Sequence, residues 1–222
     1  QNDHLKAYGL IFWTLQKEIN VDWLLNYKNG SFIIDNKDII NKEALLRGVT
    51  FQPININELN QIYATIDNNN MDIVLLEKAP KIAVYSPKDK QPWDDAVTLA
   101  LTYAEIDYDM VFDHEVLKGE LKNYDWLHLH HEDFTGQYGK FYKNYRTRPW
   151  YKKLEKDFNQ IAKEHGFSSV HILKKTVAQK IKNYIANGGF IFAMCSATDS
   201  FDIALSAWNT DIAESVFDGT PI

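Results

Sequence analysis

Only one cysteine, Cys195, is present among the 222 residues. No internal disulfide can form, which leaves the redox compartment open. Long apolar runs are also missing: no stretch approaches the roughly 20 residues that cross a bilayer, and we expect no membrane span. Cations are few, with 24 lysines and arginines against 30 acidic residues and a net charge of -6. This balance argues against a nucleic-acid partner, which requires clustered positive charge.

What the sequence does contain is the composition of a globular protein, with 45% hydrophobic and 24% charged residues. That is enough apolar material for one large core or two small ones. The first residue is Gln1 and not Met, which indicates a trimmed start or a removed leader. The compartment stays open on this basis, although a removed secretion signal favours an exported or periplasmic protein over a cytoplasmic one.

A run of turn-forming residues, Asp67 to Asn70, is the clearest break along the chain. We place a division just after it. Residues 1–70 then form an N-terminal α/β part, which could complete the sheet of the rest, and residues 80–222 form a second α/β domain. In the first part, residues 51–54 are predicted to form a strand and Asn57 to cap the next helix.

Strand and helix patterns alternate after the break. Short apolar strands are predicted at 81–85, 108–112, 126–130 and 190–194, one helix begins near Pro92 and another covers 173–185. In the first of these helices, the expected buried stripe is Ala96, Leu99, Ala100 and Tyr103. This alternation predicts a mostly parallel sheet in a three-layer α/β sandwich, with a ligand site beyond the carboxyl ends of the strands.

The last of these strands runs directly into Cys195, and the residues after it suit the start of a helix. Ala193 and Ala197 flank the cysteine at the two positions where a nucleophile elbow needs small residues. A helix N-terminus stabilises a thiolate, and the N–H of Ser196 could help to hold an oxyanion. The alternative is that Cys195 is a small buried hydrophobic residue at the end of a core strand, as most unpaired cysteines are.

A cluster of titratable side chains ends the third strand: His128, His130, His131, Glu132 and Asp133. His128 and His130 share one face of a strand, where, with a nearby carboxylate, they could bind zinc or another divalent metal. Alternatively, one of the histidines is the base for Cys195 and Glu132 orients it. A third interpretation packs His128 in the sheet and lets the others hydrogen-bond the loop.

Segments near the same edge supply candidates for ligand binding. These candidates are Ser86, Trp93 and Asp94 after the first strand, Tyr138 in the loop after the histidines, and Thr198 and Asp199 after the cysteine. The stretch 134–151 interleaves aromatic residues, glycines and cations. It is typical of a lid or of a surface that stacks on sugars or peptides, and equally of a surface excursion whose rings pack on the sheet.

The run from Gly188 to Ser200, with the order of elements from Pro80 to about Ser206, resembles the class I glutamine amidotransferase superfamily. Residues 90–95 and 124–133 are similar to a group of proteins labelled asparagine synthetase B. The resemblance implies a flavodoxin-like, class I glutamine amidotransferase-like sandwich. It also implies an amidase or amidotransferase activity with Cys195 as the nucleophile.

Two features differ from the pattern of that superfamily. Its members place a His-x-Glu pair well after the elbow, whereas no histidine follows Cys195 here. The end, 217–222, is typical of an interrupted loop, and we expect the pair either to lie in a further segment or to be missing. In addition, His-His-Glu-Asp at 130–133 replaces the glycine-rich oxyanion strand.

Two functions follow from these patterns. The first is a cysteine-dependent amide hydrolase or amidotransferase-like enzyme, without cofactor or metal, whose catalytic centre contains Cys195, Ser196, His130, His131 and Glu132. The second is a non-catalytic member of the fold that binds a small-molecule, peptide or sugar ligand or a protein partner, for example within a cell-envelope complex. A sugar- or metal-dependent hydrolase built on the histidines is a third.

Overall fold

The structure is a computed structural model that describes residues 2–87, 96–137 and 141–221. It divides into two compact units, one of residues 1–79 with 96–107 and one of residues 80–95 with 108–222. Three of the predicted site residues, Trp93, Asp94 and Tyr138, lie outside the described residues, as does the predicted helix start at Pro92.

The first unit is built around an antiparallel sheet in the order β2-β1-β3. Its strands are β1 (Val21–Leu25), β2 (Ser31–Ile34) and β3 (Asp72–Leu76), and its helices are α1 (Asn2–Gln16), α2 (Asp38–Arg47), α3 (Ile56–Asp67) and α4 (Ala96–Ala104). A tight connection containing η1 (Tyr27–Asn29) reverses the chain between β1 and β2, with positive φ at Asn26, Lys28 and Gly30. The described strands of this unit therefore form a sheet of their own and, contrary to expectation, do not complete the parallel sheet.

Residues 51–54 do not form the predicted strand. Pro53 has no N–H to donate to a sheet, and the segment has no regular structure. The cap of α3 is Asn55 and not Asn57. The Asn55 side-chain oxygen accepts the N–H of Glu58 (3.1 Å), and the Glu58 carboxylate accepts the N–H of Asn55 (2.8 Å). This reciprocal capping box sets the start of the helix.

Helix α4 buries a different face from the one predicted. Its buried residues are Thr98, Leu101 and Ala104, whereas Leu99 is 61% exposed. The cause is α1, which packs against α4 within this unit. A Cβ atom at Gly9 of α1 would lie 1.7 Å from the carbonyl oxygen of Ala104, so a glycine is needed for this close approach.

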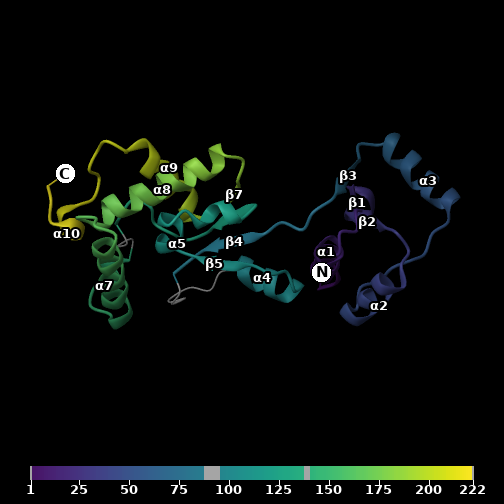
Figure 1. Ribbon diagram of the computed structural model, residues 1–222, viewed down its shortest axis with the longest axis horizontal. Coiled ribbons are helices and arrows are strands. Elements are labelled where there is room, and N and C mark those ends of the chain that lie inside the picture. The colour runs from purple at the N-terminus through teal and green to yellow at the C-terminus, as the bar shows by residue number, and fades with distance from the viewer. Residues whose placement is uncertain (1, 88–95, 138–140, 222) are drawn as a thin grey trace. The chain divides into compact units, whose positions relative to one another are not determined.

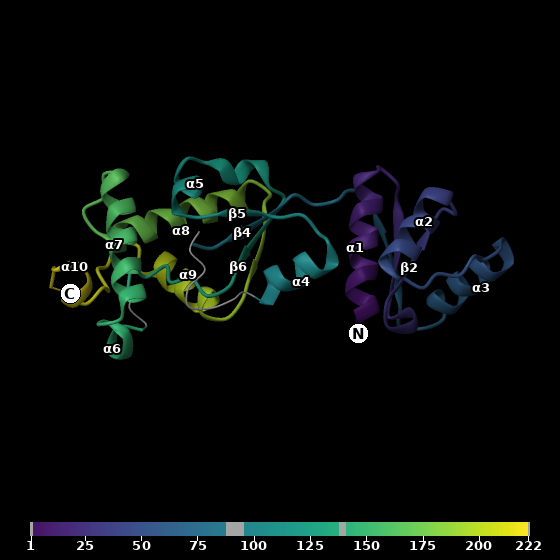
Figure 2. The same cartoon turned by 90° about the horizontal axis from the view of Figure 1, so that it is seen from below.

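The second unit is built around a four-stranded, all-parallel sheet in the order β5-β4-β6-β7. Its strands are β4 (Ile82–Tyr85), β5 (Asp109–Val111), β6 (Trp126–Leu129) and β7 (Phe190–Ala193). Its helices are α5 (Asp113–Leu117), η2 (Glu120–Asn123), α6 (Tyr142–Tyr145), α7 (Pro149–Glu164), α8 (Val170–Ala186), α9 (Ser196–Ser206) and α10 (Ser215–Asp218). Helices flank the sheet (Figures 1 and 2). The predicted parallel α/β architecture is confirmed, and it is consistent with a three-layer α/β sandwich.

One face of the parallel sheet packs against α8. Alternate residues of the strands join one buried apolar cluster with the inner stripe of the helix: Ala83, Tyr85, Val111, Leu127 and Leu129 with Leu173, Val177, Ala178 and Ile181. Burial of a large apolar side chain stabilises a fold by about 1.5–3 kcal/mol. This cluster therefore holds the strand ends, where the predicted site lies, on a rigid base.

The opposite face of the sheet is unevenly covered. Val84 pairs with His128, and His128 pairs with Phe192, so the three lie side by side. Val84 and His128 are 0% exposed, but Phe192 is 45% and Phe190 59% exposed. Strand β7, last in the sheet order, therefore carries two exposed rings on this face.

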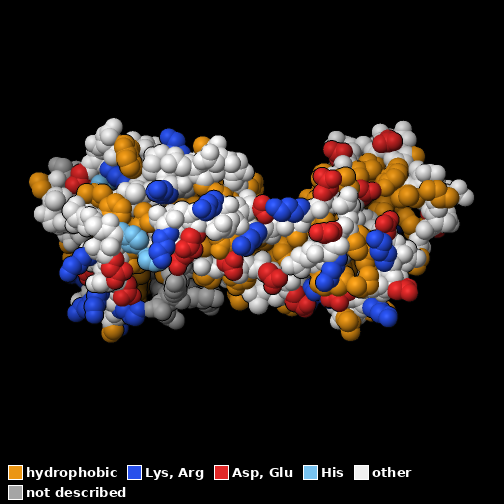
Figure 3. Space-filling view, viewed as in Figure 1, with side chains coloured by type: hydrophobic (Ala, Val, Ile, Leu, Met, Phe, Trp, Pro, Cys, Tyr) orange, Lys and Arg blue, Asp and Glu red, His pale blue; other side chains and the backbone are white. Residues whose placement is uncertain are grey.

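Among the helices that the structure describes, none combines the length and the hydropathy needed to span a membrane. On the face drawn in Figure 3, acidic and basic side chains are interspersed in each unit. Histidine side chains also reach the surface on this face.

Candidate functional site

The parallel sheet brings the predicted site residues to one edge. Ser86 follows β4, His130 follows β6, and Cys195 follows β7 after a single intervening residue. Because all four strands run in the same direction, their carboxyl ends meet at the same edge, where open α/β sheets place ligand sites.

Cys195 forms the predicted sharp turn between β7 and α9. Its φ is 51° and its ψ is -136°. Asn26 and Lys28 also have positive φ, but their ψ values of -4° and 41° place them in the ordinary left-handed region. The conformation of Cys195 is strained for any residue with a Cβ atom, and such strain concentrates at functional sites. The side chain is exposed, so the alternative of a buried hydrophobic cysteine is wrong.

Two imidazoles lie beside the sulfur. Sγ of Cys195 and one ring nitrogen from each of His130 and His131 are all within 4.8 Å of one another. The two histidine rings stack with centroids 3.7 Å apart and an interplanar angle of 22°. The structure thus gathers one thiol and two bases from strands that are neighbours in the sheet.

Backbone carbonyls tie the histidines to the elbow. The N–H of Ala197 donates to the carbonyl oxygen of His130 (3.1 Å), and the hydroxyl of Ser196 donates to that of His131 (3.1 Å). Ala197 is 0% exposed, which agrees with the need for a small side chain there. These bonds fix the position of both histidine backbones relative to the cysteine.

Glu132 closes the turn after β6. Its Oε2 accepts the backbone N–H of His130 (3.0 Å), and its carbonyl oxygen accepts the hydroxyl of Ser200 (2.8 Å). The sequence predicts that Glu132 orients a histidine ring. In the structure, the carboxylate of Glu132 bonds to the backbone of His130. Ser200 was not predicted, although its spacing of four residues from Ser196 places both hydroxyls on one face of α9.

The far end of this loop is held by α8. The ring Nδ1 of His171 is 3.0 Å from the carbonyl oxygen of Thr135. Gly136 has φ of 80°, and a Cβ atom there would lie 2.3 Å from the Cα atom of His171. Only glycine allows the chain to pass so close to the helix with this backbone conformation.

His128 does not join the group around Cys195. It is 0% exposed within β6, and its ring stacks on Phe192 with centroids 5.8 Å apart. The predicted pairing of His128 with His130 as metal ligands on one strand face is therefore replaced by a group of His130, His131 and Cys195.

The remaining predicted ligand residues lie near the ends of their elements. Ser86 is partly buried, and its hydroxyl bonds to the carbonyl oxygen of Pro87 (3.3 Å). Thr198 and Asp199 are exposed in the first turn of α9, beside the cysteine in sequence. The structure gives these two side chains access to solvent next to the elbow.

A buried ion pair lies below the sheet edge and was not predicted. Nζ of Lys174 is 2.8 Å from Oδ2 of Asp113 and 3.0 Å from the hydroxyl of Tyr85, and that hydroxyl also donates to Asp113. Lys174 is 1% and Asp113 0% exposed. Burial, then the charge of Asp113, raises the pKa of Tyr85 well above its ordinary value, and Glu132 adds to this shift. In the sequence, the buried ion pair is indicated by the position of Lys174 within the apolar stripe of α8.

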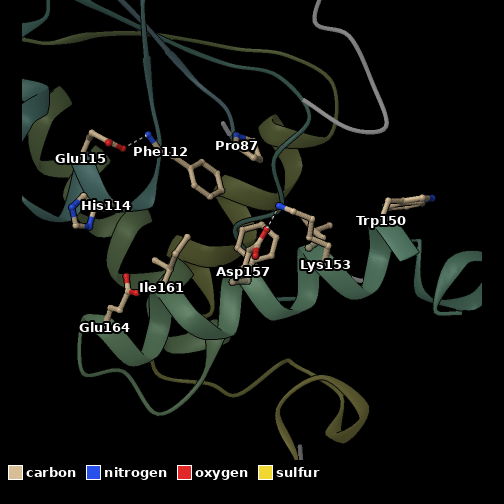
Figure 4. A pocket seen from close by; sticks show the side chains of 11 residues that line it. Pro87, Phe112, His114, Glu115, Trp150, Lys153, Asp157, Ile161 and Glu164 are labelled. Atoms are coloured by element: carbon tan, nitrogen blue, oxygen red, sulfur yellow. Dashed lines mark hydrogen bonds and ion pairs between the residues drawn. The ribbon is translucent and has the colours of Figure 1, made fainter. Parts of the chain in front are cut away.

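A cavity of about 690 Å³ opens between the end of β5 and helix α7 (Figure 4). Phe112, Trp150 and Phe158 line it with Leu154 and Ile161, and its ionisable residues are His114, Glu115, Lys153, Asp157 and Glu164. The rings of Phe112 and Phe158 each lie 4.5 Å from the ammonium of Lys174. As described, the lining includes neither Cys195 nor the two histidines.

Comparisons of the chain with family models, with curated proteins and with solved structures found no match.

Proposed function

We propose that the second unit is a cysteine-dependent amide hydrolase or amidotransferase-like enzyme on a class I glutamine amidotransferase-like fold. The observation that carries the proposal is the strained, exposed Cys195 with two imidazole nitrogens within 4.8 Å of its sulfur. The strand order supports the fold, because β5-β4-β6-β7 is the 2-1-3-4 order of flavodoxin-like sheets.

In the proposed reaction, His130 or His131 takes the thiol proton, and Sγ of Cys195 attacks the carbonyl carbon of an amide. The C–N bond breaks as a thioester forms, and ammonia or an amine leaves with the proton that the imidazole returns. Water then hydrolyses the thioester and regenerates the thiol. In this proposal, the N–H of Ser196 and the positive end of the α9 helix dipole stabilise the developing oxyanion.

Ligand binding without catalysis is the second candidate, and the cavity beside α7 favours it. Three aromatic rings, from Phe112, Trp150 and Phe158, form an apolar floor with charged groups around it. A small ligand with an apolar body suits such a cavity. Binding there does not require Cys195.

The thiol of the proposed enzyme is tested by alkylation with iodoacetamide near pH 7, about 1.5 units below the pKa of an ordinary cysteine. We expect the folded protein to be alkylated faster than the same chain unfolded in urea, with intact mass as the readout. Replacing both His130 and His131 by alanine should slow the folded protein toward the unfolded rate. A folded thiol that reacts no faster than the unfolded one would remove the proposed nucleophile.

Turnover is tested by ammonia release from glutamine and other primary amides. We expect release by the metal-free protein and none by Cys195→Ser, which keeps the side chain's shape. Release that is unchanged in Cys195→Ser would place the activity elsewhere. Absence of turnover together with Trp fluorescence changes on ligand addition, lost in Phe158→Ala, would favour the second candidate.

A further inference from the structure

We propose that His130, His131 and Cys195 also form a binding site for a zinc-class divalent cation, which blocks the thiol reversibly. The inhibition rests on the proposed function, since it assumes that Cys195 is the nucleophile. Binding of the ion does not rest on it, because binding needs only the three ligand atoms.

The three donor atoms are near enough to reach one tetrahedral zinc ion once their side chains rotate. Their donor atoms lie within 4.8 Å of one another. Zinc bonds of about 2.0–2.1 Å to nitrogen and about 2.3 Å to sulfur place tetrahedral ligand atoms about 3.3–3.6 Å apart. The widest separation therefore has to close by at most about 1.5 Å, and the two stacked imidazole rings have to turn so that both nitrogen lone pairs point at one ion.

The donor set selects the metal. Thiolate and imidazole are ligands of zinc and neighbouring transition metals, whereas magnesium and calcium prefer oxygen. Three protein ligands leave a fourth position for water, as in zinc sites that are open to solvent. On binding, the Cys195 thiol releases one proton to the buffer and both imidazoles bind as neutral rings. No electron is transferred.

The surrounding bonds hold the backbones of the two histidines in place before an ion arrives. The carbonyl oxygens of His130 and His131 accept bonds from the first turn of α9, the helix that begins after the cysteine. Glu132 then holds the His130 backbone N–H, and Ser200 holds the Glu132 carbonyl. Outer groups that bond the ligand side chains themselves typically account for 10- to 100-fold of metal affinity, and loss of a direct ligand costs at least as much.

Coordination would engage the sulfur lone pair that the proposed reaction uses. A zinc-loaded protein should therefore neither be alkylated nor turn over an amide, and removal of the ion should restore both. In this proposal, the same two imidazoles act as bases when the site is empty and as ligands when zinc is bound.

The test uses the whole chain, Zn²⁺ and equilibrium dialysis, with folding of each variant checked by circular dichroism. We expect one tightly bound zinc per chain, with affinity reduced at least about 10-fold in Cys195→Ser, His130→Ala and His131→Ala. His4→Ala, at an exposed histidine of the first unit, is the matched control and should bind like the parent protein. Co²⁺ should show sulfur-to-cobalt charge-transfer absorption that Cys195→Ser lacks, and Mg²⁺ should not compete.

His165→Ala identifies the competing site, because His165 and His114 are a second histidine pair, with ring nitrogens 2.8 Å apart. Zinc retained by all three ligand variants, or lost in His165→Ala alone, overturns the proposal, as does absence of tight binding. The proposed function is tested separately, by alkylation and ammonia release measured in the presence of a metal chelator. A protein that binds zinc through these residues but fails those two assays keeps the metal site and loses the enzyme.

Discussion

The hydroxyl of Ser196 donates a hydrogen bond to the backbone carbonyl oxygen of His131 (3.1 Å). The residue that follows the strained cysteine is thus tied to the residue that presents an imidazole to the cysteine's sulfur. Two consecutive strand ends are joined in this way, and the positions of thiol and base depend on each other. The predictions below follow from this mutual support and from the buried groups beneath it.

Backbone strain at Cys195 predicts a gain in stability when the cysteine is replaced by glycine. A conformation of this kind costs about 1–3 kcal/mol for a residue with a Cβ atom, and glycine loses about 0.5–1 kcal/mol through entropy. We expect Cys195→Gly to have a higher free energy of unfolding than Cys195→Ala, by about 1 kcal/mol, in urea denaturation. A glycine variant that is less stable than the alanine variant would contradict the strain.

Close packing of Gly136 against α8 predicts a large cost for an added methyl group. Gly136→Ala brings a Cβ atom to 2.3 Å from the Cα atom of His171, whereas Gly166 has a similar φ of 76° and nothing within 4 Å. We expect Gly166→Ala to lower the free energy of unfolding by about 1 kcal/mol and Gly136→Ala by about 2–4 kcal/mol, since overpacking adds about 1–3 kcal/mol. If the two substitutions lower the free energy of unfolding equally, the loop at Gly136 must move to accommodate the added methyl group.

The buried ion pair predicts a strong effect at Lys174. Lys174→Met leaves the carboxylate of Asp113 buried without its cation, which typically costs about 3–5 kcal/mol. The exposed Lys182 of the same helix is the matched control, and Lys182→Met should change stability by less than about 0.5 kcal/mol. Chemical denaturation measures both. The double variant Lys174→Met with Asp113→Asn should recover part of the loss, and a further loss there would argue against the pair.

Tyrosine ionisation predicts a fall in stability at alkaline pH. Burial, followed by a hydrogen bond to Asp109, raises the pKa of Tyr124 to about 12, and burial raises the pKa of Tyr85 well above the ordinary range. The folded state then keeps protons that the unfolded state loses near pH 10, so stability decreases as the pH rises from about 10 toward 12. Tyr124→Phe should make this decrease shallower.

Absorbance of tyrosinate provides the second readout of these groups. The chain has 12 tyrosines, all of which should titrate near pH 10 in urea. In the folded protein, Tyr85 and Tyr124 should ionise only at higher pH. A native titration that superimposes on the unfolded one would refute the burial of both phenols.

The sequence predicts the cysteine turn well because its causes are local. An apolar strand, small residues at 193 and 197 and a helix start lie within ten residues of one another, so no distant contact is needed to place the thiol. The parallel sheet could be predicted equally well, because the alternation of strands and helices along the sequence determines it. The antiparallel sheet of the first unit could not. Strand β2 pairs with β1 across a short connection, but β3 pairs with β1 through residues far apart in sequence, such as Val21 and Leu76.

The two histidines near the sulfur, His130 and His131, were among the predicted residues, but the strand pattern could not decide between them and the alternative pair of His128 and His130. Strand β6 ends at Leu129, one residue before the predicted end, and two consecutive histidines then leave the sheet together. The exposed face of α4 was mispredicted for a related reason, since packing by α1 decides which side is buried. Lys174 illustrates the opposite case, in which a charged residue lies on an apolar stripe and is explained by distant partners, Tyr85 at the end of β4 and Asp113 at the start of α5.

The enclosure of the Lys174 ammonium gives the chain a built-in reporter. Most lysines in a protein react readily with acetylating reagents, but one sealed behind two phenylalanine rings and bonded to a carboxylate should stay unmodified for as long as the sheet and α8 remain together. Its acetylation, followed by mass spectrometry of the peptide that carries it, would time the cooperative opening of the second unit independently of any assay at the thiol.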